Sequence, residues 1–128
     1  MNLLLDTCAL IALAAGQLPQ AARTALLTAN RALISPIVPW ELGIKVKTGK
    51  LQLPESPLLW VQALAVKHQL IMPVSGLDAA LLCAAADLPL IHRDPFDRVL
   101  IATAQRDQLT LLTSDQIIPT YPGITTLW

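Results

Sequence analysis

Short apolar runs alternate with helical segments along this chain, and this order constrains the fold more than any other feature. The sequence predicts strands at Asn2–Leu5, Ala32–Ile34, Gln69–Val74, Leu109–Thr113 and Ile124–Leu127. It predicts helices at Thr7–Ala15, Pro19–Asn30, Ser35–Thr48, Ser56–His68, Ser75–Ala86 and Pro95–Asp107. Strands that alternate with helices are typical of a parallel sheet covered by helices on both faces. We therefore expect residues 1–128 to form one α/β domain, an α/β/α sandwich with a mostly parallel central sheet.

The chain is strongly apolar, with 54% hydrophobic residues and a mean hydropathy of +0.55. Its longest uncharged run, Thr7 to Ala22, is shorter than the roughly 20 apolar residues of a membrane span. No basic residue precedes Arg23, so a signal peptide is not expected either. These features favour a soluble cytoplasmic protein whose excess apolar surface lies in a subunit interface. Cys8 and Cys83 lack metal-type spacing and are predicted to be reduced core residues.

The charge balance excludes one kind of nucleic-acid binding. Nine basic residues and nine acidic residues cancel, so the protein has no overall positive field that would attract a polyanion. Contact with nucleic acid would therefore require a local basic patch or specific chemistry.

The segment HRDPFDRVLIATA places two aspartates at the start of the last predicted helix. Asp94 fits an ordinary N-cap, because proline follows it at the first helical position. Asp97 fits this explanation less well, since the helical period places it on the same face as Leu100, Ile101 and Ala104. A carboxylate on an apolar face is costly unless a cation or hydrogen bonds meet it. Asp97 is therefore a candidate functional residue.

Three further acids have plausible structural roles when each is taken alone. Asp6 can cap a helix, Glu41 can pair with Lys45 four residues later, and Asp115 can belong to a turn. Together with Asp97, however, they lie after predicted strands or early in predicted helices, where sites form in α/β sheets. Carboxylates that converge need protons or a bound cation between them. Oxygen ligands favour Mg²⁺, with Mn²⁺ as an alternative.

Four ordered segments then resemble one known family. They are LLLDTCALIAL, SPIVPWELGIKVKTGKLQLP, LPLIHRDPFDRVLIATAQ and LTLLTSD, and a terminal LW completes the resemblance. The chain resembles the PIN-domain ribonucleases, and among them the VapC-like toxins of type II toxin–antitoxin pairs. Two positions depart from the family pattern: Cys8 stands where many relatives carry histidine, and Pro39 where a small polar residue is usual. These departures concern substrate contacts and leave the acids in place.

The resemblance implies a Mg²⁺-dependent endoribonuclease whose acidic quartet falls on Asp6, Glu41, Asp97 and Asp115. Asp6 and Asp97 would hold the metal, Glu41 would complete the acidic pocket, and Asp115 would act largely through water. Asp94 would assist. The resemblance also implies an RNA substrate, a cognate antitoxin protein and a homodimer.

Basic residues near these segments are candidates for RNA contact. Lys45, Arg93 and Arg98 would suit phosphate groups, with Lys47 and Lys50 nearby. The alternatives are a solvated helix face for the lysines and ion pairs at the edge of the core for the arginines. Both alternatives remain open on sequence alone.

The histidines and tryptophans carry weaker signals. His68 and His92 have no zinc-type spacing, and metal ligation by either is not expected. Trp40, Trp60 and Trp128 are predicted to lie in the core or a dimer interface rather than to stack on bases.

Other small α/β classes fit less well. A phospho-acceptor receiver domain needs a lysine after its last strand, but no lysine follows Lys67. A haloacid-dehalogenase-type phosphatase needs an aspartate where Cys8 stands, and no Gly-x-Gly-x-x-Gly for a dinucleotide occurs. The main alternative is a PIN domain that binds RNA or protein without cleaving.

Overall fold

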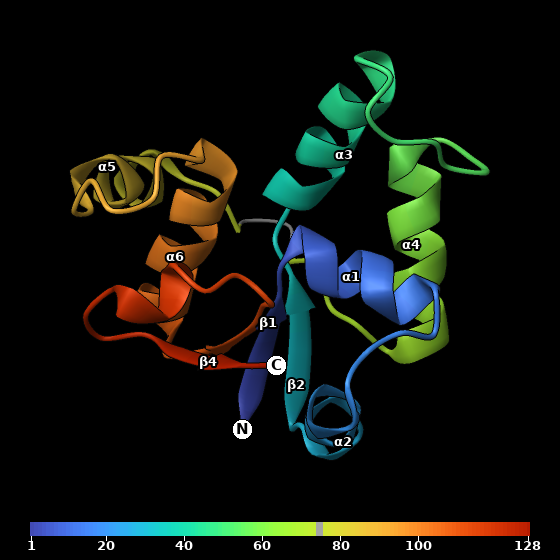
Figure 1. Cartoon of the computed structure of the whole chain (residues 1–128), viewed down its shortest axis with the longest axis horizontal. Helices are drawn as coiled ribbons and strands as arrows, with labels where there is room; N and C mark the ends of the chain where they lie inside the picture. Colours follow the sequence, from blue (N-terminus) through green and yellow to red (C-terminus); the bar gives the residue numbers. More distant parts are fainter. Residues whose placement is uncertain (74–75) are drawn as a thin grey trace.

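The computed structural model describes residues 1–73 and 76–128 (Figure 1). Its strands are β1 (Asn2–Leu5), β2 (Arg31–Ile34), β3 (Thr110–Leu112) and β4 (Thr125–Leu127). Its helices are α1 (Thr7–Ala14), α2 (Gln20–Thr28), α3 (Ile37–Lys47), α4 (Pro57–His68), α5 (Ala79–Asp87), α6 (Pro95–Asp107) and the 3₁₀ turn η1 (Ile118–Thr120). None of these helices is long and apolar enough to cross a membrane.

The strands form one sheet in the order β2-β1-β3-β4, and every pair is parallel. Leu5, the last residue of β1, pairs with Ile34 of β2 and with Leu112 of β3. These three strands therefore end at the same edge of the sheet. Asp6 and Thr113, the residues that follow β1 and β3, consequently emerge side by side at this edge. The predicted α/β class with a parallel sheet is confirmed.

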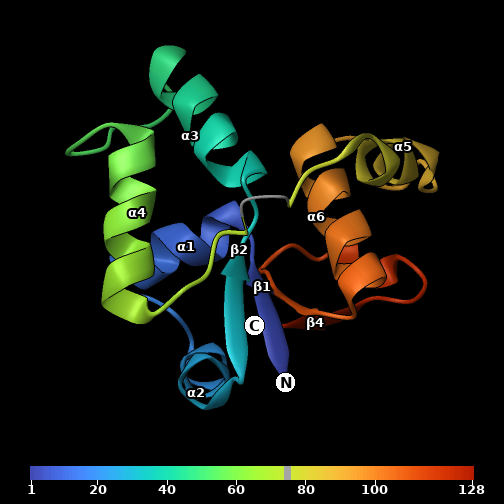
Figure 2. The ribbon, with the colours of Figure 1, turned by 180° about the vertical axis from the view of Figure 1, so that it is seen from behind.

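Helices cover the sheet on both sides. In Figure 1, α1, α3 and α4 lie to one side of β1 and β2, and α5 and α6 lie to the other; Figure 2 shows the same division from behind. Leu3, Leu4 and Leu5 of the central strand are fully buried between these layers, as are Leu111 and Leu112 of β3. Strands covered on both faces read as continuous apolar runs, and the sequence LLL of β1 shows this pattern.

The segment between α4 and α5 departs from the predicted strand Gln69–Val74. Ile71 forms an isolated parallel bridge to Leu33, and no longer ladder is present in the described part. Val74 lies outside the described residues. Pro73 has no backbone N–H to donate, which explains why the apolar run does not extend as a paired strand.

Helix α5 begins later than the sequence predicts. Its N-cap is Asp78, whose side chain accepts a hydrogen bond from the backbone N–H of Leu81 at 2.8 Å. The predicted cap, Ser75, lies outside the described residues. An aspartate satisfies the free N–H groups of a first helical turn well, and the sequence analysis overlooked Asp78.

The prediction that the cysteines are core residues is wrong. Cys8 and Cys83 are unbridged, as expected, but both are exposed. In α5 the buried positions are Leu81 and Ala85, and Cys83 lies about 200° away on the helix from each. Trp40 is 61% exposed and contacts Phe96 edge to face, with ring centroids 5.3 Å apart.

Candidate active site

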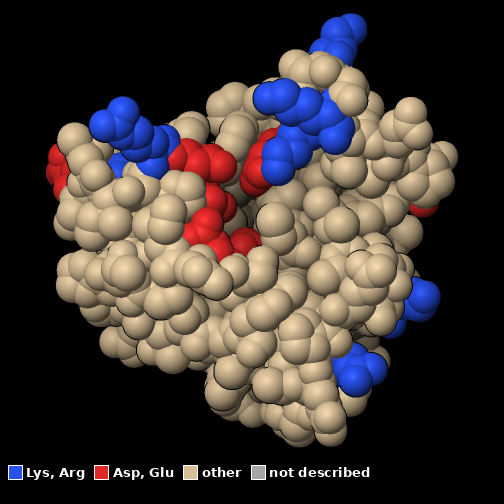
Figure 3. Space-filling model, viewed as in Figure 1, with Lys and Arg blue, Asp and Glu red and all other residues tan. Residues whose placement is uncertain are grey.

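An acidic pocket opens at the edge of the sheet where β1 and β3 end. Its volume is about 140 Å³, and its lining residues are Asp6, Thr7, Cys8, Glu41, Lys45, Asp94, Asp97, Ser114 and Asp115. In Figure 3 the acidic atoms gather in a hollow, with basic groups on either side of it. All four acids that the sequence singled out, together with Asp94, therefore meet in one cavity, although they span more than one hundred residues of the chain.

Asp6 lies at the end of the central strand and lines the pocket. It follows β1 directly and is buried, and its Oδ1 accepts a hydrogen bond from the backbone N–H of Ala9 at 2.6 Å. The residue is therefore a helix cap and a pocket residue at once. Burial raises the pKa of Asp6 above its usual range, against hydrogen bonds from Thr113 and Ala9 that lower it. The negative charges of Glu41 and Asp115 raise this pKa further.

Glu41 enters the pocket from the buried face of α3, which it shares with Ile37, Val38 and Leu42. Its two carboxylate oxygens have different partners. Oε1 accepts a hydrogen bond from Thr7 Oγ1 at 2.7 Å, and Oε2 lies 2.7 Å from Lys45 Nζ. The predicted pairing with Lys45 is therefore present. Burial lowers the pKa of Lys45, but the hydrogen bond and negative charge of Glu41 outweigh it, so this pKa is raised.

Asp97 lies in the first turn of α6, beside the cap that Asp94 forms by accepting the Phe96 N–H at 2.9 Å. Burial raises the pKa of Asp97 to about 7, and the charge of Asp94 adds to this effect, whereas His92 opposes it. Asp97 Oδ2 lies 2.9 Å from His92 Nε2. Near neutral pH the metal-free site thus holds a proton that a cation can replace.

Asp115 is fixed by the turn that follows β3. Its Oδ1 accepts the backbone N–H groups of Ile117 and Ile118 at 2.7 and 3.0 Å, and its Oδ2 lies 3.2 Å from His92 Nε2. Burial raises the pKa of Asp115, but the hydrogen bonds from Ile118, Ile117 and His92 outweigh it, so the pKa is lowered. Near neutral pH, Asp115 is therefore charged, whereas Asp97 is partly protonated.

The sequence analysis missed His92. Ligand atoms of His92, Asp97 and Asp115 lie within 4.8 Å of one another. The only sequence signal was its position two residues before Asp94 in the acidic segment, and the absence of zinc-type spacing led the analysis away from it.

Arg98 is not available for RNA contact, which corrects its prediction as a rim residue. It is 7% exposed, and its guanidinium donates hydrogen bonds to four backbone carbonyls, those of Ala86, Leu88, Pro89 and His92, at 2.7–3.1 Å. A planar guanidinium has five donors and can satisfy several carbonyls at once. Arg98 therefore stabilises the connection between α5 and α6, and its partners are carbonyls rather than the acids expected for an ion pair.

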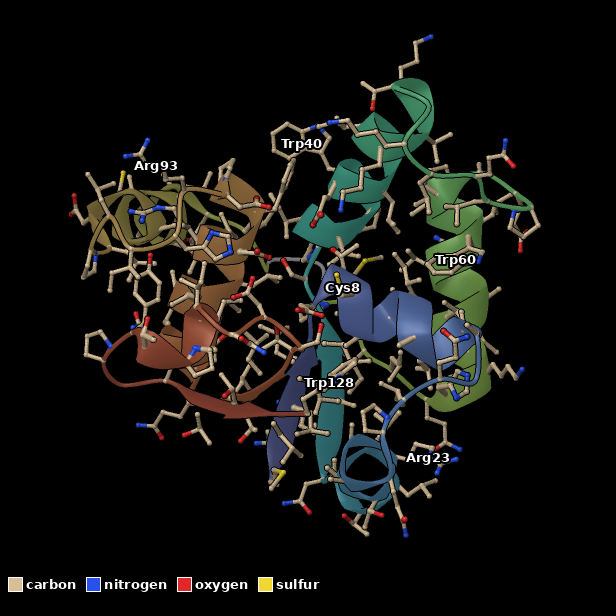
Figure 4. All side chains as sticks on the ribbon, viewed as in Figure 1. Cys8, Arg23, Trp40, Trp60, Arg93 and Trp128 are labelled. Carbon is tan, nitrogen blue, oxygen red and sulfur yellow. The ribbon has the colours of Figure 1, made fainter. Side chains whose placement is uncertain are left out.

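Lys45 and Arg93 remain candidates for RNA contact, because both line a groove beside the acidic pocket. Lys45 lines the acidic pocket and also an adjoining groove of about 490 Å³, which Arg93 and Lys50 line as well. Figure 4 shows Arg93 and Cys8 at different sides of this region, Arg93 over α5 and Cys8 at the start of α1. Positive charge thus lies beside the acids without neutralising all of them.

The donor set suits a hard divalent cation. Carboxylate oxygens from Asp6, Glu41 and Asp97 face one small cavity, and repulsion among such groups is relieved by a proton or a metal ion. Mg²⁺ binds through one or two carboxylates and keeps several waters, which a cavity of about 140 Å³ can accommodate.

Comparison with known proteins agrees with this geometry. The family model of the PIN domain matches residues 3–123. The chain belongs to the PIN-domain family. No curated protein matches the sequence.

Two solved structures share the fold of this PIN domain. One is a chain of VapBC2 from Rickettsia felis bound to a DNA fragment from its promoter, with a TM-score of 0.70 and 17% identity over 99% of this chain and 98% of that one. The other is a chain of DNA-bound VapBC from Salmonella typhimurium, with a TM-score of 0.68 and 20% identity over 99% and 97%. The predicted PIN-like architecture is therefore confirmed.

Proposed function

We propose that this PIN domain is a metal-dependent endoribonuclease that uses Mg²⁺, or Mn²⁺ in its place, and forms the toxin of a type II toxin–antitoxin pair. The observation that supports this most strongly is the convergence of four acids from β1, α3, α6 and the turn after β3 in one pocket. PIN domains are generally nucleases, and acids that share one pocket can hold the cation that such chemistry uses. We infer that residues 1–128 form one nuclease domain.

Each acid has a separate role in this proposal. Asp6 and Asp97 provide the oxygen ligands for the cation, and Glu41, held by Thr7 and Lys45, completes the pocket. Asp115 has both oxygens engaged by other groups and acts through water. When bound, the cation activates a water molecule and stabilises the negative charge that develops on the phosphoryl group.

Asp94 assists from the rim of the same pocket, where it caps α6. We infer that Lys45 and Arg93 contact the RNA backbone. Both line the groove that adjoins the acids, and phosphate contacts provide most of the affinity of such complexes.

An antitoxin and a second copy of the chain are the proposed protein partners, and the cytoplasm is the proposed place of action. Support comes from the two VapBC structures that share the fold, and from an apolar groove of about 360 Å³ beside the site. Ile37, Trp40, Leu82 and Phe96 are among its lining residues. An antitoxin segment in this groove could place a basic side chain in the acidic pocket and displace the cation.

The test is cleavage of an RNA pool by the purified chain with Mg²⁺, with Mn²⁺ and with a chelator. We expect cleavage only with a divalent ion, and none by Asp97→Asn under any condition. Equal cleavage by Asp97→Asn would show that Asp97 is only a helix-entry residue and would contradict its role in holding the cation. RNA binding without cleavage would instead identify a catalytically silent PIN domain.

A further inference from the structure

His92 links two of the acids through a single ring nitrogen. Its Nε2 lies 2.9 Å from Asp97 Oδ2 and 3.2 Å from Asp115 Oδ2, and the side chain is largely buried. Its Nδ1 faces the backbone N–H of Asp94 at 3.3 Å and can only accept there. In the neutral ring the proton therefore resides on Nε2, where it can be donated to Asp115 Oδ2, while Asp97 Oδ2 lies at ion-pair distance from the same nitrogen.

The ring has little freedom to leave this position. The backbone N–H of His92 donates to Tyr121 Oη at 2.7 Å, and its carbonyl accepts from Arg98 Nη1 at 3.1 Å. Arg98 is itself buried and bonded to the carbonyls around it. The backbone that carries the imidazole is thus anchored to α6 and to the segment after β3, the two elements that carry Asp97 and Asp115.

The carboxylate oxygens of Asp115 and Asp97 differ in how many partners they have. Asp115 has both oxygens engaged, Oδ1 by two backbone N–H groups and Oδ2 by His92. Asp97 has Oδ2 at His92, and its Oδ1 has no hydrogen-bond partner among residues 1–73 and 76–128. One oxygen of Asp97 is consequently oriented, and the other is left for a further ligand.

We propose that His92 is a positioning residue for the metal site: its Nε2 holds Asp97 Oδ2 in place, leaves Asp97 Oδ1 for the cation, and couples Asp115 to Asp97. This inference rests on the proposed function and deepens it. Metal-binding carboxylates are commonly oriented by such outer hydrogen bonds, whose loss typically costs 10–100-fold in metal affinity. His92 is not a metal ligand here, because Nε2 ligation would place an Nδ1 proton against the N–H of Asp94.

The test measures Mn²⁺ affinity by electron paramagnetic resonance, so it does not depend on RNA cleavage. His92→Gln can still donate an N–H near the Nε2 position, whereas His92→Leu has similar bulk and no donor. We expect His92→Gln to bind Mn²⁺ within about threefold of wild type and His92→Leu to bind about 10–100-fold more weakly. His68→Leu, which changes the histidine at the end of α4, is the matched control and should bind as wild type does.

A double-mutant cycle tests the path from Asp115. Asp115→Ala should weaken Mn²⁺ binding in the wild-type background and weaken it clearly less beside His92→Leu, because the path through His92 is then already broken and only the contribution through water remains. Additive effects would show that Asp115 acts independently of His92 and would overturn that part of the proposal.

Three results would overturn the role of His92: equal Mn²⁺ affinity of wild type and His92→Leu, a loss in His92→Gln as large as in His92→Leu, or ¹⁴N hyperfine coupling that shows direct ligation. If His92→Leu does not fold, His92→Asn replaces it, because its shorter amide falls short of both carboxylates and the same loss is expected. Mn²⁺ binding without RNA cleavage would contradict the proposed function alone. No Mn²⁺ binding by the wild type would overturn both.

Discussion

Asp97→Asn should stabilise the metal-free protein, and the size of this effect should depend on pH. The pKa of Asp97 is raised from its ordinary value of 3.8 to about 7. At about 1.4 kcal/mol per pKa unit, ionising this group costs the folded state up to about 4 kcal/mol. A fifth of the side chain is exposed, and solvent screening reduces this value. We expect a gain of about 1–2 kcal/mol in the free energy of unfolding.

The direction of the pH dependence follows from proton counting. Below about pH 4 Asp97 is protonated in both states, and the variant has no advantage. Between about pH 4 and pH 7 the unfolded chain releases this proton while the folded chain retains it, so wild-type stability falls as pH rises. Above about pH 7 both states are ionised and the difference is constant. The advantage of Asp97→Asn should therefore grow from near zero to its full value over this range.

Urea denaturation of both proteins in chelator, at about pH 5 and about pH 8, measures this effect. Saturating Mg²⁺ at pH 8 should reverse the order, because it binds folded wild type; about 100-fold above its dissociation constant it adds about 2.7 kcal/mol. An advantage that does not change with pH, or a variant less stable than wild type at pH 8 in chelator, would refute the reasoning.

Three further predictions concern other parts of the molecule. Arg98→Met should lower the free energy of unfolding by about 3 kcal/mol, because it removes charged hydrogen bonds from a buried guanidinium to four backbone carbonyls; a loss under about 1 kcal/mol in urea denaturation would contradict this. Asp94→Asn should change stability by less than about 0.5 kcal/mol and leave most RNA cleavage, since asparagine also caps helices; complete loss of cleavage would make Asp94 essential. Sedimentation should show a two-fold dimer at micromolar concentration, with Trp40→Ala shifting it toward monomer if the exposed Trp40 lies in the interface; a monomeric wild type would contradict the dimer.

The order of elements could be predicted because local signals mark it. Helix α6 has the predicted bounds, since Asp94 caps it, proline occupies its first position, and Gln108 ends it in the left-handed conformation. The β1 strand is recognisable because it is covered on both faces and therefore continuously apolar. Asp97 was recognisable because its helical face is otherwise apolar.

The roles of His92 and Arg98 could not be predicted because they depend on contacts between distant segments. His92 meets Asp115 only after β3 pairs with β1 and places the following turn beside α6. Arg98 reads as a charged surface residue until the connection after α5 folds around it. For Trp40 the sequence left the core and a dimer interface open, and only the structure shows that α3 places it at the surface against Phe96.

The central claim is that the acids at the end of the sheet hold a divalent cation. Anomalous diffraction from crystals soaked in Mn²⁺ tests it most directly, because Mn²⁺ replaces Mg²⁺ at oxygen sites and is located by its own signal. The account predicts one strong peak in the acidic pocket, about 2.0–2.3 Å from carboxylate oxygens of Asp6 and Asp97. A peak elsewhere, or no peak in the pocket at saturating Mn²⁺, would contradict it.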